Sequence, residues 1–528
     1  MSNHAYESAA ALRPSSNGPI PISTLCERFS LAPASAEDAA ALSDLSILGV
    51  SVDSADTAPG ELFVGLPGFT VHGARFAADA VASGAVAVLT DADGVQIVHQ
   101  TAPGTPVLVH SDPRAVVGPL SAEVYHHPAR GLVTTAVTGT NGKTTTAYFL
   151  DAILSAHVGG CMVAGTVELR VGERSVESPR TTVEAPVLQR MMALAVEDRV
   201  GAASLEASSH AIVLHRLDGI VVDVAGFTNL QRDHLDFHKT MEGYLEAKAQ
   251  LFTPEHARRG VVCVDDQWGA ALAAEAPIEI DRVRAYPGET PADWWVSDAA
   301  VSLTDSATTF TLHGPDGEKI EASCPLPGLV NVQNAALALV MAIRAGVPAA
   351  TAAAALAGAH NIPGRMQRIS QRDGRRGLCI VDFAHTPEAM ELALKAVRPI
   401  TPGRLIVVFG SDGDRDQGKR PMLGEVCARL ADVLVVTDEN PRSEDPQLIR
   451  NAILEGVRGV RPDLTDVEEI TTWRGDAVRR GVELCGPDDT VIVTGKGHEP
   501  FLEMAGEFIR YNDAPVMAEA VEEKWGRA

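Results

Sequence analysis

Short apolar runs that alternate with helical patterns organise most of the chain. Residues 46–92 carry the runs ILGVSV, ELFVGL and AVAVLT, separated by Gly, Pro and Asp, and residues 74–84 have helical spacing. This pattern predicts a small α/β domain that ends near residue 129. A strand over 132–137, a Gly-rich turn and a helix to about residue 156 are expected to begin a second unit.

The remainder of the chain predicts a hairpin, two helices and a regular strand–helix alternation. Residues 308–324 alternate on both sides of a Pro-Asp-Gly turn, which is typical of a β-hairpin. Ala-rich helices are expected over 332–345 and 349–357. From about residue 363 the alternation predicts a parallel sheet covered by helices. Its strands are expected over 378–383, 405–409, 433–436 and 491–493, and its helices over 387–397, 422–430 and 446–456.

Composition and charge exclude several classes of protein. The chain has 44 basic and 69 acidic residues, a net charge of −25, which argues against a nucleic-acid partner because attraction to phosphate needs a basic face. One of the longer apolar runs, 335–343, is about half a membrane span, and no signal peptide is recognisable. The seven cysteines are scattered without a CxxC pair. We therefore expect a cytoplasmic protein with no membrane insertion.

The strongest chemical signal is the segment VTGTNGKTTT at 137–146, placed between a predicted strand and a predicted helix. Small residues let backbone N–H groups approach phosphates, Lys143 can reach the β- and γ-phosphates, and the Thr144 hydroxyl can ligate Mg²⁺. Val137 stands where the standard phosphate loop has glycine. The segment predicts ATP and Mg²⁺ as ligands; the alternative is a Gly-rich turn with an incidental lysine.

Together these patterns predict an α/β protein of three domains, which suits a length of 528 residues at about 150 per domain. The first covers residues 1–130, with a disordered tail over 1–20. The second, over 131–361, is a central domain like the P-loop ATPases, with a parallel sheet. The third, over 362–528, is expected to be a Rossmann-like, doubly wound domain.

These residues resemble those of the Mur ligases, the ATP-dependent enzymes that add amino acids to the peptidoglycan precursor, and of the related folylpolyglutamate synthetases. The shortened loop GTNGKTTT carries the resemblance first. Further motifs follow in one order: DSADTAPGELFVGLPG at 53–68, TT at 181–182, EASSHA at 206–211, FTNLQRDHLDFH at 227–238, YLEAKAQLF at 244–252, LPGLVNVQN at 326–334, IPGRMQ at 362–367, VDFAHTP at 381–387, GDRDQGKRPM at 413–422, DENPRSEDP at 438–446 and GKGHE at 495–499.

The resemblance implies an ATP-dependent amide ligase of peptidoglycan and cell-wall synthesis, and thus a role in cell shape and division. ATP would phosphorylate the D-glutamyl side-chain carboxylate of UDP-N-acetylmuramoyl-L-alanyl-D-glutamate, and the amine of meso-diaminopimelate would attack the acyl phosphate. L-Lysine or L-ornithine as the amino acid remain alternatives. More remote alternatives are a folylpolyglutamate synthetase and a non-catalytic nucleotide-dependent binding module. We expect a monomer that acts on small molecules only.

The resemblance also implies a role for individual residues. The catalytic set is Lys143, Glu206, His234 and Lys248, with Lys248 carbamylated, and the metal ligands are Thr144, Glu206, His234 and Lys248. The expected ATP contacts are Gly139, Thr140, Asn141, Gly142, Lys143, Thr144, Thr145, Asn331 and Arg365. The expected contacts of the UDP substrate, whose uridine side falls to the first domain, are Asp53, Ser54, Thr70, Thr181, Thr182, Ser208 and Arg216.

The incoming amino acid is expected at the loops that follow the four strands of the third domain, because ligands bind at the carboxyl edge of doubly wound sheets. Arginine offers a rigid fork for a carboxylate. By resemblance to the family, Asn-Pro-Arg at 440–442 looks like the diaminopimelate-type signature. The implied contacts are Arg415, Glu439, Asn440, Pro441, Arg442, Gly495 and Glu499. Departures from the family pattern occur at Ala55, Arg180, Leu214, Ser411, Asp412 and Glu439.

Overall fold

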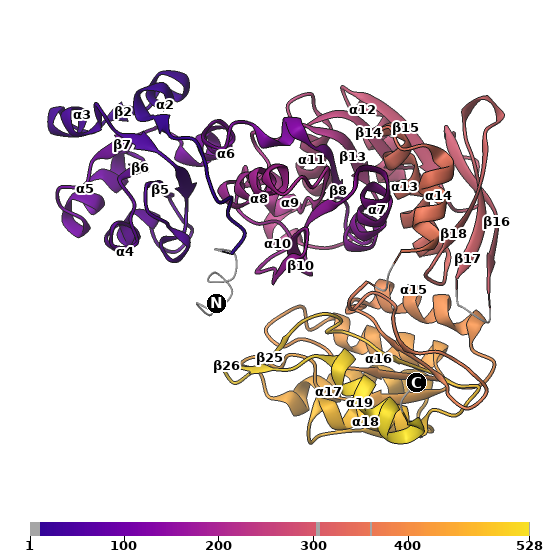
Figure 1. Cartoon of the computed structure of the whole chain (residues 1–528). Coiled ribbons are helices and arrows are strands. Elements are labelled where there is room, and N and C mark those ends of the chain that lie inside the picture. Colours follow the sequence, from indigo (N-terminus) through magenta and orange to yellow (C-terminus); the bar gives the residue numbers. More distant parts are fainter. Residues whose placement is uncertain (1–10, 303–306, 360–361, 527–528) are drawn as a thin grey trace. The chain divides into compact units, whose positions relative to one another are not determined.

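The computed structural model describes residues 11–302, 307–359 and 362–526, and Figure 1 shows the chain coloured along its length. It divides into two compact units. The first unit contains residues 1–295, 314–318 and 334–355, and the second contains 296–313, 319–333 and 356–528. Each unit is built on twisted, mostly parallel sheets covered by helices, which confirms the predicted α/β class. The three domain boundaries predicted from the sequence stay predictions.

A five-stranded sheet forms the N-terminal part of the first unit. Its strands β4 to β7 are parallel, and β2 is antiparallel at the edge. Helices α2 and α6 contribute Leu25 and Leu120 to the core on one face, and α5 contributes Val98 to the core on the other. The sheet order is β2 (Ala32–Pro33), β7 (Val107–Val109), β6 (Ala87–Thr90), β5 (Glu61–Gly65) and β4 (Gly49–Ser51). The flanking elements are β1 (Ile20–Pro21), α2 (Ile22–Phe29), α3 (Ala36–Leu42), β3 (Ser46–Ile47), η1 (Ser54–Asp56), η2 (Gly73–Phe76), α4 (Ala77–Ala82), α5 (Ala92–Thr101) and α6 (Pro113–Val124).

The segment before β1 is packed, which corrects the predicted disordered tail from residue 12 onward. Leu12 is fully buried, Arg13 forms ion pairs with Asp56 and Glu61, and Asn17 donates hydrogen bonds to two backbone carbonyls. A polar composition hid these contacts, since only one apolar side chain anchors the segment. Residues 1–10 lie outside the described residues.

The central sheet carries seven parallel strands around β8 (Val133–Thr138), with helices on both faces. Its order is β11 (Arg174–Glu177), β10 (Glu168–Val171), β9 (Cys161–Ala164), β12 (Ala202–Glu206), β8, β13 (Val222–Phe227), β14 (Ala257–Cys263), β15 (Glu279–Arg284), β16 (Trp294–Val301), β17 (Thr308–His313) and β18 (Lys319–Cys324). The helices are α7 (Lys143–Val158), α8 (Ala185–Glu197), α9 (Ser209–Val213), α10 (Leu235–His238), α11 (Met241–Ala249), α12 (Gln267–Glu275), α13 (Leu329–Arg344) and α14 (Ala349–Ala357). Strands β17 and β18 form the predicted hairpin.

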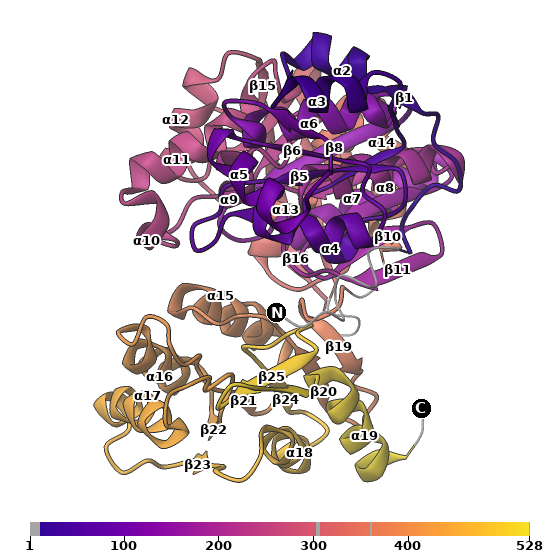
Figure 2. The same ribbon diagram turned by 90° about the vertical axis from the view of Figure 1, so that its left-hand side faces the viewer.

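The second unit holds a six-stranded sheet in the order β19 (Gln367–Ser370), β20 (Leu378–Val381), β24 (Thr490–Val493), β21 (Leu405–Phe409), β22 (Val433–Val436) and β23 (Val467–Glu469). Only β19 is antiparallel. Because the chain moves one way from β20 to β23 and returns to β24, right-handed crossovers put α15 (Pro387–Val397), α16 (Lys419–Leu430) and α17 (Pro446–Val460) on one face. The other face carries α18 (Arg474–Leu484) and α19 (Asp513–Trp525), as Figure 2 shows. A hairpin of β25 (Phe501–Met504) and β26 (Glu507–Arg510) precedes α19.

Candidate active site

The predicted phosphate loop lies between β8 and α7, at the carboxyl end of a central strand. Gly139 and Gly142 have φ angles of +142° and +90°. A Cβ atom would stand 1.9 Å from Thr228 Oγ1 at Gly139 and 2.3 Å from Asn334 Oδ1 at Gly142, so both positions require glycine. Lys143 Nζ donates to two carbonyl oxygens of its own loop at 3.0 and 2.9 Å. The ammonium group therefore lies over the loop, at the N-terminus of α7.

The loop after β13 braces the phosphate loop through Asn141. The Asn229 amide accepts from the Asn141 N–H and donates to the Asn141 carbonyl, each at 3.1 Å. Thr228 Oγ1 donates to the same carbonyl at 2.6 Å, and Gln231 Oε1 accepts from Asn141 Nδ2 at 2.8 Å. Of the motif at 227–238, only His234 was predicted to belong to the site. Thr228, Asn229 and Gln231 lie in the same motif and could have been predicted from it.

Glu206 ends β12 and places a buried carboxylate against the phosphate loop. Its Oε2 atom accepts hydrogen bonds from Thr144 Oγ1 and Thr166 Oγ1, both at 2.9 Å, and its Oε1 atom accepts from the Thr166 N–H at 2.8 Å. Thr144 and Glu206, two of the predicted Mg²⁺ ligands, are thus in direct contact. Thr145 is buried in the first turn of α7.

Lys248 projects from α11 toward the same loop. Its Nζ atom donates to the Gly139 carbonyl at 2.9 Å and lies 4.4 Å from the ring centroid of Tyr244. Burial, and then the ammonium group of Lys143, lower the pKa of Lys248 well below its ordinary value. A buried amine that loses its proton easily is chemically suited to carbamylation.

His234 precedes α10 and is exposed, with a left-handed φ of +51°. Its ring lies 4.8 Å from that of His210, and His238 stacks on Tyr244 at 4.8 Å. Burial, and then the neighbouring His210, lower the pKa of His238 to about 4. Among the residues that the structure describes, no three His, Cys, Asp or Glu side chains converge on a metal position. Of the four predicted metal ligands, only Glu206 and His234 are residues of these types.

A cavity of about 360 Å³ opens between the N-terminal sheet and the helix α8, within the first unit. Two predicted contacts of the UDP substrate, Asp53 and Ser54, line it. The Asp53 carboxylate also accepts from the Ala55 N–H at 2.9 Å, which caps η1. Thr70, also predicted there, lies in an exposed loop and is not among the lining residues.

Arginine side chains converge on Glu184 at the wall of this cavity. Their nitrogens approach the carboxylate at 3.7 Å from Arg114, 3.0 Å from Arg180 and 2.9 Å from Arg216. Three guanidinium groups around one carboxylate leave a net positive charge, which suits a phosphate-bearing ligand. Arg114 was missed because it lies in an ordinary helical pattern, and Arg180 entered the sequence analysis only as a departure from the family.

The other predicted contacts of the UDP substrate are joined by hydrogen bonds near the end of β12. Thr182 Oγ1 donates to the Glu206 carbonyl at 2.7 Å and accepts from the Ser208 N–H at 3.0 Å. Arg216 Nη1 donates to the Thr182 carbonyl at 3.1 Å. Thr181 Oγ1 is 3.2 Å from Thr166 Oγ1, so this group also borders the carboxylate of Glu206.

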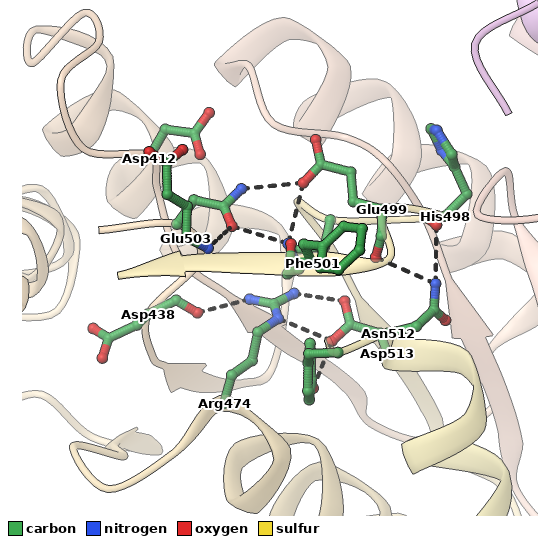
Figure 3. Close-up of polar contacts among 12 residues, drawn as sticks. Asp412, Asp438, Arg474, His498, Glu499, Phe501, Glu503, Asn512 and Asp513 are labelled. Atoms are coloured by element: carbon green, nitrogen blue, oxygen red, sulfur yellow. Dashed lines mark hydrogen bonds and ion pairs between the residues drawn. The ribbon is translucent and has the colours of Figure 1, made fainter. Parts of the chain in front are cut away.

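In the second unit the predicted amino-acid residues lie in the loops that follow β21, β22 and β24, at the carboxyl edge of the six-stranded sheet. Figure 3 shows Glu499 of this group, with Glu503 and Asp412. Arg442 lies 3.8 Å from both Asp412 Oδ2 and Glu503 Oε2. Asn440 Nδ2 donates to Glu499 Oε2 at 3.1 Å. A guanidinium group and several carboxylates at one edge match an ion-pairing site for an amino-acid head group. Pro441 is buried in the same loop, and Arg415 is exposed in the loop after β21.

Glu439 is 3% exposed and packs against Gly495, where a Cβ atom would meet Glu439 Oε2 at 2.4 Å. Burial, and then the nearby Asp412 carboxylate, raise the pKa of Glu439 to about 8. Lys496, which the sequence analysis passed over between Gly495 and Gly497, is fully buried. Its Nζ atom donates to Asn440 Oδ1 at 3.0 Å and pairs with Glu499 Oε2 at 3.1 Å. Lys496 therefore orients two predicted substrate contacts.

The last two predicted ATP contacts, Asn331 and Arg365, belong to the second unit. Asn331 lies inside the first turn of α13, which begins at Leu329, and its Nδ2 atom donates to the Pro327 carbonyl at 2.8 Å. The Arg365 guanidinium stacks 4.2 Å from the ring centroid of Phe383.

Within the described residues, no helix combines the length and apolar character needed to cross a membrane.

Three family descriptions match successive parts of the chain. The Mur ligase family catalytic domain matches residues 46–123, the Mur ligase middle domain matches 137–342, and the Mur ligase glutamate ligase domain matches 364–497. These segments cover most of the chain in the order that its motifs suggested.

Relatives and solved structures agree with these matches. The UDP-N-acetylmuramoyl-L-alanyl-D-glutamate–2,6-diaminopimelate ligase of Streptomyces avermitilis is 43% identical over 483 residues, which are 92% of this chain and 94% of the relative. The UDP-N-acetylmuramyl-tripeptide synthetase of Leifsonia xyli subsp. xyli is 42% identical over 508 residues, 95% of this chain and 96% of the relative.

A solved UDP-N-acetylmuramoyl-L-alanyl-D-glutamate–2,6-diaminopimelate ligase has a TM-score of 0.63 at 31% identity, covering 90% of this chain and 95% of its own. The ADP complex of the MurF ligase of Thermotoga maritima shares the fold, with a TM-score of 0.61 at 18% identity over 90% of this chain and 97% of its own. The chain belongs to the Mur ligase family and is an ATP-dependent ligase.

Proposed function

We propose that the chain joins meso-diaminopimelate to the D-glutamyl side-chain carboxylate of UDP-N-acetylmuramoyl-L-alanyl-D-glutamate, as a cytoplasmic monomer that makes a peptidoglycan precursor. The observation that carries the proposal is the edge of the second unit's sheet, where Arg442 lies among the carboxylates of Asp412 and Glu503. An amino-acid head needs a guanidinium for its carboxylate and a carboxylate for its ammonium. The names of the Streptomyces relatives support the choice of substrates.

The phosphate loop would hold ATP through its backbone N–H groups and the N-terminus of α7. Lys143 stabilises the charge that develops on the transferred phosphoryl group, because the phosphate loop holds its ammonium through the carbonyls of Gly139 and Thr140. The acceptor is the D-glutamyl carboxylate, and ADP leaves when the acyl phosphate forms. Attack by the incoming amine then releases phosphate and closes the amide bond.

The residues near the loop fit Mg²⁺. Thr144 Oγ1 and Glu206 Oε2 are hard oxygen donors 2.9 Å apart, as a Mg²⁺ site beside a nucleotide requires. We assign Thr144, Glu206, His234 and a carbamylated Lys248 to hold the ions. Bound Mg²⁺ would neutralise phosphate oxygens during transfer. Carbamylation suits Lys248 because it replaces a cation next to Lys143 with an anionic ligand.

The UDP substrate is assigned to the cavity of the first unit. Asp53 and Ser54 line one side, and the cluster of Arg114, Arg180 and Glu184 lines another. The net positive charge of that cluster complements the diphosphate. Thr181, Thr182, Ser208 and Arg216 extend from the cavity toward the Glu206 carboxylate, which is the direction that the D-glutamyl end must take to be phosphorylated.

The charge compensation of Arg442 at the same edge leaves room for lysine or ornithine as a second candidate. Asp412 and Glu503 both lie 3.8 Å from Arg442 and compensate its charge. A side chain that ends in an ammonium alone would pair with these carboxylates, whereas diaminopimelate must also bring a second carboxylate to Arg442.

Phosphate release tests the assignment directly. The purified protein, ATP, Mg²⁺ and UDP-N-acetylmuramoyl-L-alanyl-D-glutamate are combined with meso-diaminopimelate, L-lysine or L-ornithine, and the product is identified by mass. We expect the highest kcat/KM with meso-diaminopimelate. A higher kcat/KM with lysine or ornithine would mean that this amino acid, and not meso-diaminopimelate, is the substrate. Stimulation only by a folate, or by no small acceptor, would overturn the proposed function.

A further inference from the structure

A fully buried arginine lies directly behind the amino-acid loops. Arg474 is the first residue of α18, and its guanidinium makes four hydrogen bonds. Nε and Nη2 donate to Asp513 Oδ1 and Oδ2 at 2.9 and 2.8 Å, Nη1 donates to the Asp438 carbonyl at 2.9 Å, and Nη2 donates to the Thr494 carbonyl at 2.8 Å. Figure 3 shows the Arg474 guanidinium between Asp438 and Asp513.

The two carbonyl groups belong to the loops that are assigned to the amino acid. Asp438 follows β22 and precedes Glu439 to Arg442, whereas Thr494 follows β24 and precedes Gly495 to Glu499. Strand β21 lies between β22 and β24 in the sheet. Arg474 therefore bridges, from behind, two loops that no direct strand pairing joins. At the edge itself the same loops are also linked by the hydrogen bonds of Asn440 with Glu499 and Lys496.

The chemistry of the bridge requires arginine with a buried carboxylate. A planar guanidinium can donate in three directions at once, whereas a lysine ammonium cannot match this fork. Asp513 neutralises the charge, and Tyr511 also donates to Asp513 Oδ1 at 2.9 Å. Arg474 and Asp513 are both fully buried, so water does not screen the interaction.

The start of α19 also holds the second loop. Asn512 Nδ2 donates to the carbonyls of His498 and Glu499 at 3.0 and 3.3 Å, and Asn512 Oδ1 caps α19 by accepting from the Ala514 N–H. The loop that carries Gly495 and Glu499 is therefore fixed by two consecutive residues, Asn512 and Asp513. Asn512 reaches this loop through backbone carbonyls, and Asp513 reaches it through Arg474.

We propose that Arg474 and Asp513 are positioning residues of the ligation reaction, which hold the loops after β22 and β24 at the separation that the incoming amino acid requires. This inference rests on the proposed function. It predicts an effect on the amino acid, because the two bridged loops carry contacts assigned to it. The phosphate loop and the cavity for the UDP substrate belong to the first unit, and the ATP contacts of the second unit, Asn331 and Arg365, precede both bridged loops in the chain.

The test uses the full chain with Arg474→Met and Asp513→Leu combined, which removes both buried charges together. The matched control is Arg479→Met with Glu519→Leu, because Arg479 and Glu519 form an exposed ion pair at 2.8 Å between the same helices, α18 and α19. Initial rates of phosphate release give KM for each substrate, and thermal unfolding gives Tm. Arg474→Lys, which keeps the charge but loses the fork, is a second variant if the double variant does not fold.

We expect KM for the amino acid to rise by about ten-fold or more in the Arg474 variants, because small misplacements of binding groups are costly. KM for ATP and for the UDP substrate should stay at wild-type values, saturating amino acid should restore kcat, and the control should match wild type in all constants.

An unchanged KM for the amino acid, or a common change in all three KM values, would reduce the pair to a structural role and overturn the inference. Failure of the wild type itself to use any of the tested amino acids would instead contradict the proposed function.

Discussion

Lys143 is the residue whose removal should separate catalysis from folding most cleanly. Its ammonium group donates to carbonyl oxygens of its own loop, and its side chain is only half-buried at the first residue of α7. Lys143→Ala should lower kcat by about 100-fold or more, because the developing charge on the phosphoryl group loses its nearest ammonium. Phosphate release and Tm, measured on the same preparation, check this.

The Lys143 prediction needs a control of the same charge change. Lys239→Ala removes an exposed lysine from the same unit. The control should keep wild-type kcat, and both variants should keep Tm. Wild-type turnover in Lys143→Ala would remove the lysine from the proposed mechanism, and with it the role of the loop in phosphoryl transfer.

Glu439 makes a prediction about pH and stability. Burial, and then Asp412, raise its pKa to about 8 in the folded protein, whereas a glutamate in the unfolded chain titrates near 4.3. The folded state thus holds a proton that the unfolded state has lost. The resulting stability is complete below about pH 4 and is lost as pH rises to about 8, with a slope of at most about 1.4 kcal/mol per pH unit.

The variant Glu439→Gln should lose this slope, because glutamine does not titrate. Urea unfolding of wild type and variant at about pH 5.5 and pH 8 measures the difference in free energy of unfolding. Glu519→Gln, at an exposed site in the same unit, should keep the wild-type slope. Parallel curves for wild type and Glu439→Gln would show that the carboxyl group is ionised when folded.

At the scale of elements, the junction of β8 and α7 depends on Gly142. Alanine there would need a φ of +90°, and its Cβ atom would lie 2.3 Å from Asn334 Oδ1 on α13. The φ angle alone costs about 1–2 kcal/mol. Gly142→Ala should therefore displace the loop and weaken ATP binding by about ten-fold or more, as measured by calorimetry.

The opposite end of α7 supplies the matched control for Gly142. Gly159 has a similar φ of +85°, and a Cβ atom there would meet nothing within 4 Å. Gly159→Ala should lower Tm through the same backbone strain and leave ATP affinity unchanged. Equal ATP affinity in the two alanine variants would mean that the close contact with Asn334 does not control the loop.

The elements that the sequence predicted well are those with strong periodicity and clear ends. The helices α14 and α15 begin and end at the predicted residues, and β21 and β22 match their apolar runs. Strands β19 and β23 were not predicted, because they are short edge strands whose residues alternate weakly. The hairpin of β10 and β11 was not predicted either, because it lies at the edge of the sheet and charged residues interrupt its apolar pattern. Edge strands bury little surface and so leave a weak pattern.

The candidate site was predicted in a different way from the fold. Spacing and small residues marked the phosphate loop, but the contact between Thr144 and Glu206 joins residues far apart in sequence, and only the resemblance to a family paired them. Arg474 had neither a motif nor a pattern, since its partners are backbone carbonyls and one distant carboxylate. Such contacts follow from tertiary packing, which periodicity does not record.

At the scale of the whole molecule, the net charge of −25 does not describe the places where anions are expected. The cavity in the first unit is bordered by Arg114 and Arg180, and the phosphate loop carries Lys143. Local cations therefore set the chemistry of the two regions where phosphates are expected, and the net charge of the chain favours solubility.

A buried ion pair joins the two walls of the cavity, which are the helix α8 and the segment η1 of the N-terminal part. Arg190 on α8 lies 2.8 Å from Asp56 Oδ2, at the end of η1, and both side chains are almost fully buried. Asp56 lines the cavity and also pairs with Arg13. Arg190→Met would leave the buried carboxylate with one partner fewer, which costs about 3–5 kcal/mol when a buried pair is broken.

Arg190→Met should therefore lower Tm and raise KM for the UDP substrate, while KM for the amino acid, whose residues lie in the second unit, stays constant. Arg174→Met is the matched control, because Arg174 pairs with Asp198 at 3.5 Å on the surface of the same unit. It should leave both quantities unchanged. A lower Tm with an unchanged KM for the UDP substrate would show that the cavity is not the site of that substrate, since the walls joined by Arg190 and Asp56 could then move without affecting its binding.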